Sequence, residues 1–408
     1  MSKENKKQKK FIEVIRELEE VIITQSGADV FSEIFKLIFA KLIDELDVKN
    51  RGYKSKFVGL ADFYKNVIVL FEKARVKWPS VFAPQEKFNL NRECTKNCFE
   101  ILENINVLDY SIAETTDAFE YILPDVVKKK RGQYFTPEHV VELMINVLKP
   151  ESDELVIDPA CGSGGYLINS LNLIYKNSGN KKVNLKNIYG VDTDDKSIKI
   201  AQAIKIIAGK EYDYNLKKLD TINSLVWEGL SLKKHRFDCL LTNPPFSGDV
   251  NDKSVLENYE LAFDEKDKLK PRMDRHILFL ERIIDLLKPG GRAAVILPQG
   301  VLNNKNMASV RKYLLSNTQV FAIISLDRNI FRPYTDTKTS IVFFRRWQAG
   351  DDRTIDYSVF MAVSEKSGKD HLGRPIYIKN SKISNGNSLE LDHDLNDILI
   401  EYLKVKKE

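Results

Sequence analysis

Apolar residues recur at three- and four-residue steps through the first third of the chain. In the clearest stretch, residues 30–44 (VFSEIFKLIFAKLID), the apolar positions fall on one helical face over several turns. Asp29 stands directly before this stretch and is a suitable N-cap residue. No clear strand-like alternation occurs between residues 11 and 121. The pattern predicts an all-helical N-terminal domain over residues 1–125, ending near the basic run 128–131.

From residue 154 onward, short apolar runs alternate with helical segments. The runs occupy residues 155–158, 188–192, 237–242 and 292–297. A helix is expected over residues 274–288, with Asp274 at its start and Pro289-Gly290-Gly291 as its stop. Continuous apolar strands separated by helices predict a mostly parallel sheet with helices on both faces.

Two later apolar runs, residues 320–326 and 340–344, have only a short connection between them. They predict a hairpin that places one antiparallel strand near the sheet edge. The second domain therefore spans residues 126–350. The remaining residues, 351–408, form a polar extension in which a short helix is expected at 395–404.

Composition narrows the protein class. The 408 residues are 43% hydrophobic and 30% charged, as in ordinary globular proteins, and no apolar run of membrane-spanning length occurs. The lysine-rich start lacks the apolar core of a secretory signal. Four cysteines, Cys94, Cys98, Cys161 and Cys239, form no CxxC pair, so we expect no disulfide framework, no metal site and a cytoplasmic setting. The net charge of +5 permits a nucleic-acid partner without requiring one.

A glycine-rich segment follows the first predicted strand and opens a helix. Its glycines permit a tight turn and let a ligand approach the main chain, although a purely structural turn is the alternative. It is neither a Walker loop nor G-x-G-x-x-G, which disfavours a dinucleotide. The Asp158 carboxylate is suited to accept from a ligand ammonium group. The segment reads Asp158-Pro159-Ala160-Cys161-Gly162-Ser163-Gly164-Gly165.

Two further aspartates follow predicted strands. Asp192 ends the second strand, where a carboxylate can accept both ribose hydroxyl hydrogens; the alternative is an N-cap for the helix that begins at residues 193–195. Asp220 follows a weaker third strand and is placed to accept from an adenine amino group. Its alternative is an ordinary turn aspartate.

The tetrapeptide Asn243-Pro244-Pro245-Phe246 ends the buried strand 237–242. Its two prolines fix the backbone and remove two N–H donors, so the Asn243 amide oxygen and the Pro244 carbonyl can face one point as acceptors. An amino group held between them has a less conjugated and more nucleophilic nitrogen. Phe246 offers a face on which a flat base can stack. A rigid strand-end turn is the alternative for the tetrapeptide alone.

In this order, the segments resemble the amino-methyltransferases of the N6-adenine DNA class. The resemblance makes Asp158, Ala160, Gly162, Ser163, Gly164 and Gly165 the cofactor loop, Asp192 the ribose acid and Asn243 to Phe246 the catalytic tetrapeptide. An upstream segment is similar to the one that covers the methionine half of S-adenosylmethionine, which implies the gamma order of motifs. That segment contributes Gln133, Tyr134, Phe135, Thr136, Pro137 and Glu138.

From about residue 128 to 344, the pattern resembles the modification subunit of type I restriction-modification systems. The resemblance implies a doubly wound, seven-stranded Rossmann-like α/β methyltransferase sheet and a flipped adenine in double-stranded DNA as the substrate. It also implies a specificity subunit as partner, with a restriction subunit and a second copy of the chain as further candidates. An RNA base or a protein glutamine is the alternative substrate, and a non-catalytic assembly subunit is the alternative role. Asp192 stands where many relatives carry glutamate.

Overall fold

The computed structural model describes residues 9–59, 61–123, 136–178, 183–209, 213–223, 236–353, 356–378 and 390–406. Contacts between residues divide the chain into two units. One unit contains residues 1–124 and 199–213, and the other contains residues 125–198 and 214–408. Helix α9 (Asp195–Ala208) contributes residues to both units.

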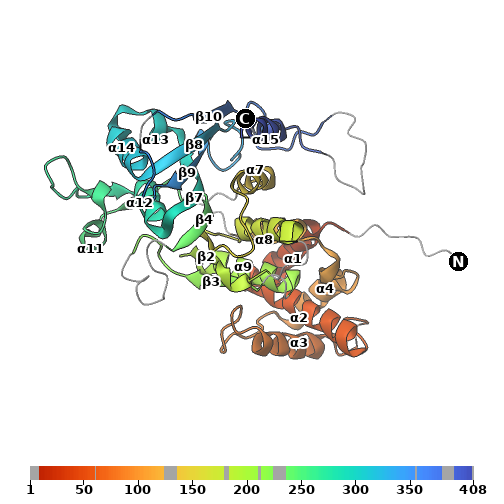
Figure 1. Ribbon diagram of the computed structural model, residues 1–408. Helices are drawn as coiled ribbons and strands as arrows, with labels where there is room; N and C mark the ends of the chain where they lie inside the picture. The colour runs from red at the N-terminus through yellow and green to blue at the C-terminus, as the bar shows by residue number, and fades with distance from the viewer. Residues whose placement is uncertain are drawn as a thin grey trace. The chain divides into compact units, whose positions relative to one another are not determined.

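Residues 9–59 and 61–123 are helical and contain no strand, as the apolar periodicity predicts. The Asp29 carboxylate caps helix α2 by accepting from the Ser32 N–H at 2.8 Å, and Gly52, whose φ is 64°, is the C-cap residue that follows the helix. Aromatic rings fill the core of this unit, with Phe35 packed 4.8 Å from Phe119 between ring centroids. The helices are α1 (Phe11–Gln25), α2 (Val30–Arg51), α3 (Phe63–Lys77), α4 (Arg92–Glu103) and α5 (Ile112–Tyr121) (Figure 1).

The second unit is built on a large sheet, which among the described residues has eight strands in the order β10-β8-β9-β7-β4-β1-β2-β3. Strand β9 is antiparallel to both of its neighbours, and every other pair of neighbours is parallel. The predicted hairpin and its single antiparallel strand are therefore confirmed. The strands are β1 (Val156–Asp158), β2 (Ile188–Asp192), β3 (Asn215–Lys218), β4 (Phe237–Thr242), β7 (Leu287–Pro298), β8 (Thr318–Ser325), β9 (Thr339–Arg346) and β10 (Phe360–Val363).

Strand β10 adds one strand to the seven that the resemblance implies. It comes from the extension and pairs in parallel with β8, with Phe360 opposite Ala322. Its run is only four residues long, and Met361 and Val363 are exposed, so it lacks the buried apolar character that identifies the inner strands.

Helices cover both faces of the sheet. Figure 1 shows α12 and α14 on one side of strands β7 to β9, and α7 and α15 on the other. No described helix has the length and apolarity needed to cross a membrane. The helices are α7 (Glu138–Leu148), α8 (Gly165–Ser178), α9, α11 (Lys253–Leu256), α12 (Arg275–Leu286), α13 (Gln299–Asn303), α14 (Ala308–Asn317) and α15 (Leu395–Val405).

The segment Pro289-Gly290-Gly291 does not stop helix α12, so that prediction is wrong. The helix ends at Leu286, and β7 begins at the next residue. Residues 288–291 instead bulge out of β7, since Phe237 pairs with Leu287 and Cys239 with Arg292. A Cβ at Gly291 would lie 2.7 Å from the Phe237 carbonyl oxygen, so the bulge requires glycine there.

The parallel register brings the functional candidates to one edge of the sheet. Val156 of β1 pairs with Ile188 of β2 and with Cys239 of β4. The carboxyl ends of these three strands therefore lie side by side, and ligands of open parallel sheets bind outside such ends. After β4, the short strands β5 (Asp249–Val250) and β6 (Met273–Asp274) pair in antiparallel fashion. They enclose a folded segment, residues 251–272, in which Leu256, Tyr259 and Ala262 are buried.

Candidate active site

The glycine loop is tied to the end of strand β2. Gly162 and Gly164 have φ values of 51° and 88°, a region that favours glycine. The Gly162 N–H donates to Asp192 Oδ2 at 3.0 Å, and the Cys161 N–H donates to the Val191 carbonyl at 2.8 Å. The loop that follows β1 is thus fixed by the strand beside it.

Asp192 is buried at the end of β2, and its burial raises its pKa. Its Oδ1 accepts from the Asp194 N–H at 2.9 Å. The helix beyond is capped by Asp194, whose carboxylate accepts from the Ser197 N–H at 2.8 Å. The capping role that was the alternative for Asp192 therefore falls to Asp194, and Asp192 joins two loops at the sheet edge.

Asp158 ends strand β1 and is fully buried. Its Oδ1 accepts from the Ala160 N–H at 3.0 Å, and the buried Thr242 hydroxyl is the other donor near the carboxylate. Burial raises the pKa of this carboxyl group to about 7. A buried carboxylate is costly unless a cation or donors neutralise it, so this position fits a cationic ligand group.

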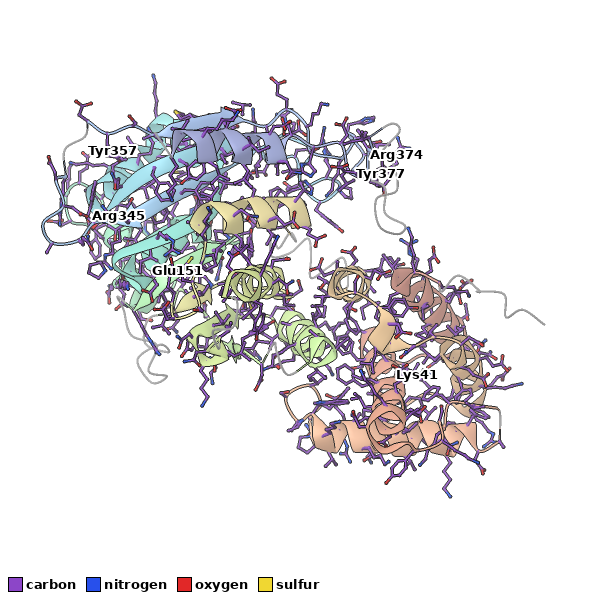
Figure 2. The ribbon with its side chains drawn as sticks, turned by 45° about the vertical axis from the view of Figure 1, so that its right-hand side comes forward. Lys41, Glu151, Arg345, Tyr357, Arg374 and Tyr377 are labelled. Atoms are coloured by element: carbon purple, nitrogen blue, oxygen red, sulfur yellow. The ribbon has the colours of Figure 1, made fainter. Side chains whose placement is uncertain are left out.

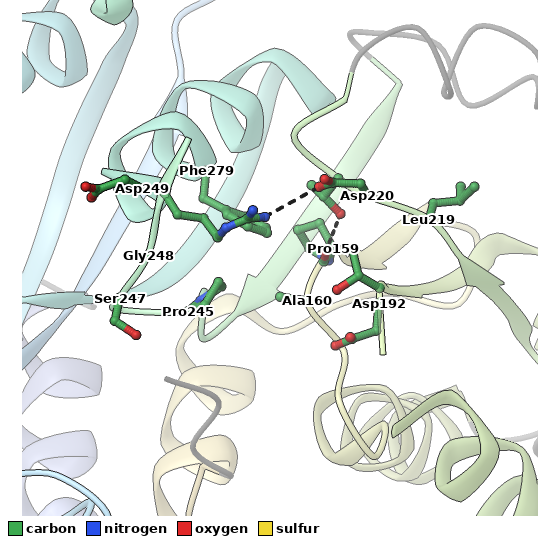
Figure 3. A pocket seen from close by; sticks show the side chains of 13 residues that line it. Pro159, Ala160, Asp192, Leu219, Asp220, Pro245, Ser247, Gly248, Asp249 and Phe279 are labelled. Carbon is green, nitrogen blue, oxygen red and sulfur yellow. Dashed lines mark hydrogen bonds and ion pairs between the residues drawn. The ribbon is translucent and has the colours of Figure 1, made fainter. Parts of the chain in front are cut away.

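A cavity of about 390 Å³ opens at this edge (Figure 3). Four of the predicted residues line it: Ala160, Asp192, Asp220 and Pro245. The remaining lining residues are Pro159, Thr193, Leu219, Thr221, Ser247, Gly248, Asp249, Arg275 and Phe279. The cavity thus combines apolar walls with several carboxylates, a surface suited to a flat ligand that carries hydrogen-bond donors.

Asp220 and Arg275 form the outer rim of this cavity. Asp220 Oδ1 lies 3.7 Å from Arg275 Nη1, and the two side chains are 42% and 31% exposed (Figure 3). Asp220 Oδ1 also accepts from the Ile222 N–H at 3.1 Å, which is the turn role that was its alternative. Arg275 is the first residue of helix α12, and its N–H donates to the Gly248 carbonyl at 2.8 Å. Its place at the rim depends on this tertiary contact, so nothing near it in the sequence indicates the role.

The Asn243 side chain leads into a short hydrogen-bonded chain. Its Nδ2 donates to Thr136 Oγ1 at 3.1 Å, and the Tyr166 hydroxyl donates to the same oxygen at 2.9 Å. Tyr166 is buried in helix α8 against Met144. Sequence reasoning missed Tyr166, although an aromatic residue directly after the glycine loop was a usable signal.

The aromatic end of the tetrapeptide rests on a second ring. Pro244 is buried, and Phe246 is half-buried. The Phe246 ring lies 5.8 Å from the Phe331 ring at an interplanar angle of 83°, an edge-to-face contact. Phe331, which belongs to the loop between β8 and β9, was not predicted as a site residue.

The remaining predicted cofactor-binding residues lie in the segment that leads into helix α7 and in the glycine loop. Gln133, Tyr134 and Phe135 lie outside the described residues, as does the basic run 128–131. Pro137 occupies the N-cap position of helix α7, and Glu138 is its exposed first residue. Ser163 is buried in the glycine loop, and Gly165 begins helix α8.

The fold and the site define a class. A doubly wound sheet with one antiparallel strand, a glycine loop after β1 and acidic strand ends beside a cavity is the arrangement of a Rossmann-like methyltransferase domain. The family model described as N-6 DNA Methylase matches residues 111–384, and the chain belongs to this family.

Curated relatives and a solved structure agree with this membership. The chain is 29% identical to the EcoEI type I restriction enzyme methylase subunit of Escherichia coli, over 61% of this chain and 50% of that protein. It is 27% identical to the HindI methylase subunit of Haemophilus influenzae, over 79% of this chain and 68% of that protein. The chain thus spans half to two thirds of these relatives. The methyltransferase subunit of a type I system from Streptococcus thermophilus shares the fold, with a TM-score of 0.61, 17% identity and coverage of 97% and 92%.

Proposed function

We propose that the chain is an S-adenosylmethionine-dependent DNA methyltransferase that modifies the N6 amino group of adenine as the modification subunit of a type I restriction-modification complex. The arrangement of the Asn243–Phe246 corner at the edge that holds the acid-lined cavity carries this proposal. Family membership and the names of the relatives support it.

The residues at the sheet edge fit this cofactor. S-adenosylmethionine supplies, when bound, an electrophilic methyl group on a sulfonium. Asp192 would accept the ribose hydroxyls, and Asp220 the adenine amino group, between the apolar side chains of the cavity. Asp158 would take the ammonium group, because burial opposes the ionisation of its carboxyl group and a cation beside it would offset that cost. Thr136, Pro137, Glu138 and the loop from Ala160 to Gly165 would enclose the rest.

The catalytic task of the protein is to hold and activate a neutral amino group. The Asn243 amide oxygen and the Pro244 carbonyl accept its two hydrogens and stabilise the positive charge that develops on nitrogen. Thr136 turns the nitrogen end of the Asn243 amide toward itself, which directs the oxygen end away. Phe246 stacks on the base, a contact worth about 1–3 kcal/mol. An adenine must leave the duplex to reach this corner, so base flipping is part of the proposal.

Partners follow from the relatives, which are subunits of type I restriction enzymes. We propose that the chain contacts double-stranded DNA and works with a specificity subunit that selects the target sequence. A restriction subunit and a second copy of this chain are further partners in the same proposal.

Methyl transfer by an Asn243→Ala variant tests the catalytic assignment. Loss of the amide oxygen should lower the rate at least about a hundredfold, as loss of one preorganised polar group does elsewhere. Cofactor affinity by calorimetry should stay near wild type. Retained transfer would remove Asn243 from catalysis, and transfer to RNA or to a protein glutamine alone would replace the DNA substrate.

Thr136→Val tests the orientation of that amide. The variant keeps the shape of threonine but cannot accept from Asn243 or Tyr166. The rate should fall about tenfold, the equivalent of the one hydrogen bond that orients the Asn243 amide. Thr136→Ser should restore the rate, because serine keeps the hydroxyl. Equal rates for the valine and serine variants would contradict the orienting role.

A further inference from the structure

A turn in the C-terminal segment holds the loop between β8 and β9 at two points. Lys369 Nζ donates to the carbonyl oxygens of Ile330 and Arg332, at 3.1 and 3.3 Å. Gly373 lies so close to the same loop that a Cβ there would be 2.6 Å from the Pro333 nitrogen. The loop (residues 326–338) and the turn (residues 364–375) are therefore in close polar and steric contact.

The turn has its own internal support. The Asp370 carboxylate accepts from the N–H groups of Leu372 and Arg374, each at 2.9 Å, and from Arg374 Nε at 2.8 Å. Gly373 has a φ of 84°, which the turn requires. Arg374 and Tyr377 mark this part of the chain in Figure 2. A carboxylate that closes several hydrogen bonds around itself makes a stiff turn.

The turn is also anchored to the rest of its unit. The Ser364 N–H donates to the Ser325 carbonyl at 2.8 Å, which joins the turn to the end of β8. The Ser364 hydroxyl donates to Asp394 Oδ1 at 2.6 Å, at the start of helix α15. A stiff, anchored turn can transmit its position to the loop that it contacts.

Phe331 lies between the two carbonyl groups that Lys369 binds. Its side chain is only 1% exposed, and its ring makes the edge-to-face contact with Phe246. Because buried rings are closely packed, a shift of the loop moves Phe331, and its edge-to-face contact passes the shift to the half-buried Phe246 ring. The C-terminal turn is thereby connected to the aromatic end of the tetrapeptide through a single intermediate ring.

We propose that Lys369 and Gly373 are positioning residues for the tetrapeptide Asn243–Phe246. In this proposal the turn 364–375 is a brace that sets the position of Phe246. The role of Phe246 in this proposal rests on the proposed function. The brace itself does not, because it consists of contacts within the chain.

Hydrogen–deuterium exchange of the full chain tests the brace directly. The reporters are the N–H groups of Ile330, Arg332 and Tyr334, which donate to Asp327, Asn329 and Phe331 within the loop. Lys369→Met keeps the apolar stem but removes both hydrogen bonds to the loop, so exchange at these three amides should rise at least about tenfold, the equivalent of one of the two bonds. Lys366→Met is the matched control: Lys366 lies in the same turn but pairs with Asp392. Unchanged exchange in Lys369→Met would overturn the brace.

The consequence for the site is measured as methyl transfer to unmodified DNA by the chain purified with its bound partners. Lys369→Met should lower the rate several-fold with cofactor affinity unchanged, while Lys366→Met stays at wild type. Gly373→Ala, which must displace the loop or the turn, should act in the same direction. Faster exchange with an unchanged rate would remove the positioning role. Absence of transfer by the wild-type chain would instead contradict the proposed function, and the exchange measurement would still decide the brace.

Discussion

Asp192 and Asp220 line the same cavity, yet they belong to different surroundings. Asp192 is buried and accepts from backbone N–H groups of its own and the neighbouring loop. Asp220 is 42% exposed; one backbone N–H, that of Ile222, donates to its Oδ1, and a further partner is the Arg275 side chain. Backbone donors fixed by the fold hold the inner acid in place before any ligand binds, whereas a side-chain pair at the rim can exchange its partner. The buried acids of the site, Asp192 and Asp158, should therefore contribute most of the affinity for the cofactor. Asp220 at the rim should change that affinity only slightly.

The largest effect is expected from Asp192→Ala. The substitution removes the proposed ribose contact together with the acceptor of the Gly162 N–H, and two charge-assisted bonds amount to about 3 kcal/mol. Cofactor affinity measured by calorimetry should fall about a hundredfold. Asp195→Ala is the control, because Asp195 is 76% exposed and pairs with Lys218. Similar affinities for the two variants would contradict the ribose assignment.

The pH dependence of cofactor binding tests Asp158. The carboxylate must be ionised to hold an ammonium group, and burial raises its pKa to about 7. Affinity should therefore be highest above pH 7 and fall about tenfold per pH unit below it. Asp158→Asn should remove this dependence and bind weakly at every pH. A wild-type affinity that is level between pH 5.5 and 8, a range set about that pKa, would exclude Asp158 from the ammonium contact.

The buried Asp158 carboxylate should also lower the stability of the folded chain. Its pKa in the folded chain lies above the ordinary value of 3.8, so the folded state resists its ionisation. The penalty is absent below pH 3.8, grows as the pH rises, and is complete above about 7. Asp158→Asn should raise the free energy of unfolding at pH 8 by as much as about 4 kcal/mol, and should leave it unchanged at low pH. Denaturant titrations at the two pH values measure the difference, and destabilisation at pH 8 would contradict the account.

The smallest effect is expected from Asp220→Asn. The side chain is partly exposed and solvent screens its interactions, so cofactor affinity should change by less than about fivefold, roughly 1 kcal/mol. Calorimetry beside Asp192→Ala makes this a direct comparison. A loss as large as that of the inner acid would remove the distinction between inner acids and rim.

The sequence supports much of this fold because its signals are local. The apolar runs at β1, β2, β4 and β7 and the periodicity of α2 identify elements without knowledge of their neighbours. Short elements escape such reasoning, as β10 does. The segment Pro289-Gly290-Gly291 was predicted wrongly for another reason. Gly291 is needed because the backbone there lies close to the Phe237 carbonyl, and this contact exists only once the two strands have paired.

The candidate site divides in the same way. Its motifs at the ends of β1, β2 and β4 are continuous in the chain and could be recognised, and strand register then brings them together. Arg275, Phe331 and Lys369 reach the site or its support only through tertiary contacts, and nothing near them in the sequence marks the role. Positioning residues of this kind become visible only in the folded chain.

The central claim is tested most directly by identifying the methylated product. DNA from cells that lack the gene is incubated with labelled S-adenosylmethionine and the chain purified with its bound partners, then hydrolysed and analysed by mass spectrometry. The account predicts labelled N6-methyl-2′-deoxyadenosine with the wild-type chain and none with Asn243→Ala. Label on a cytosine or on protein alone, or equal label with both chains, would contradict it.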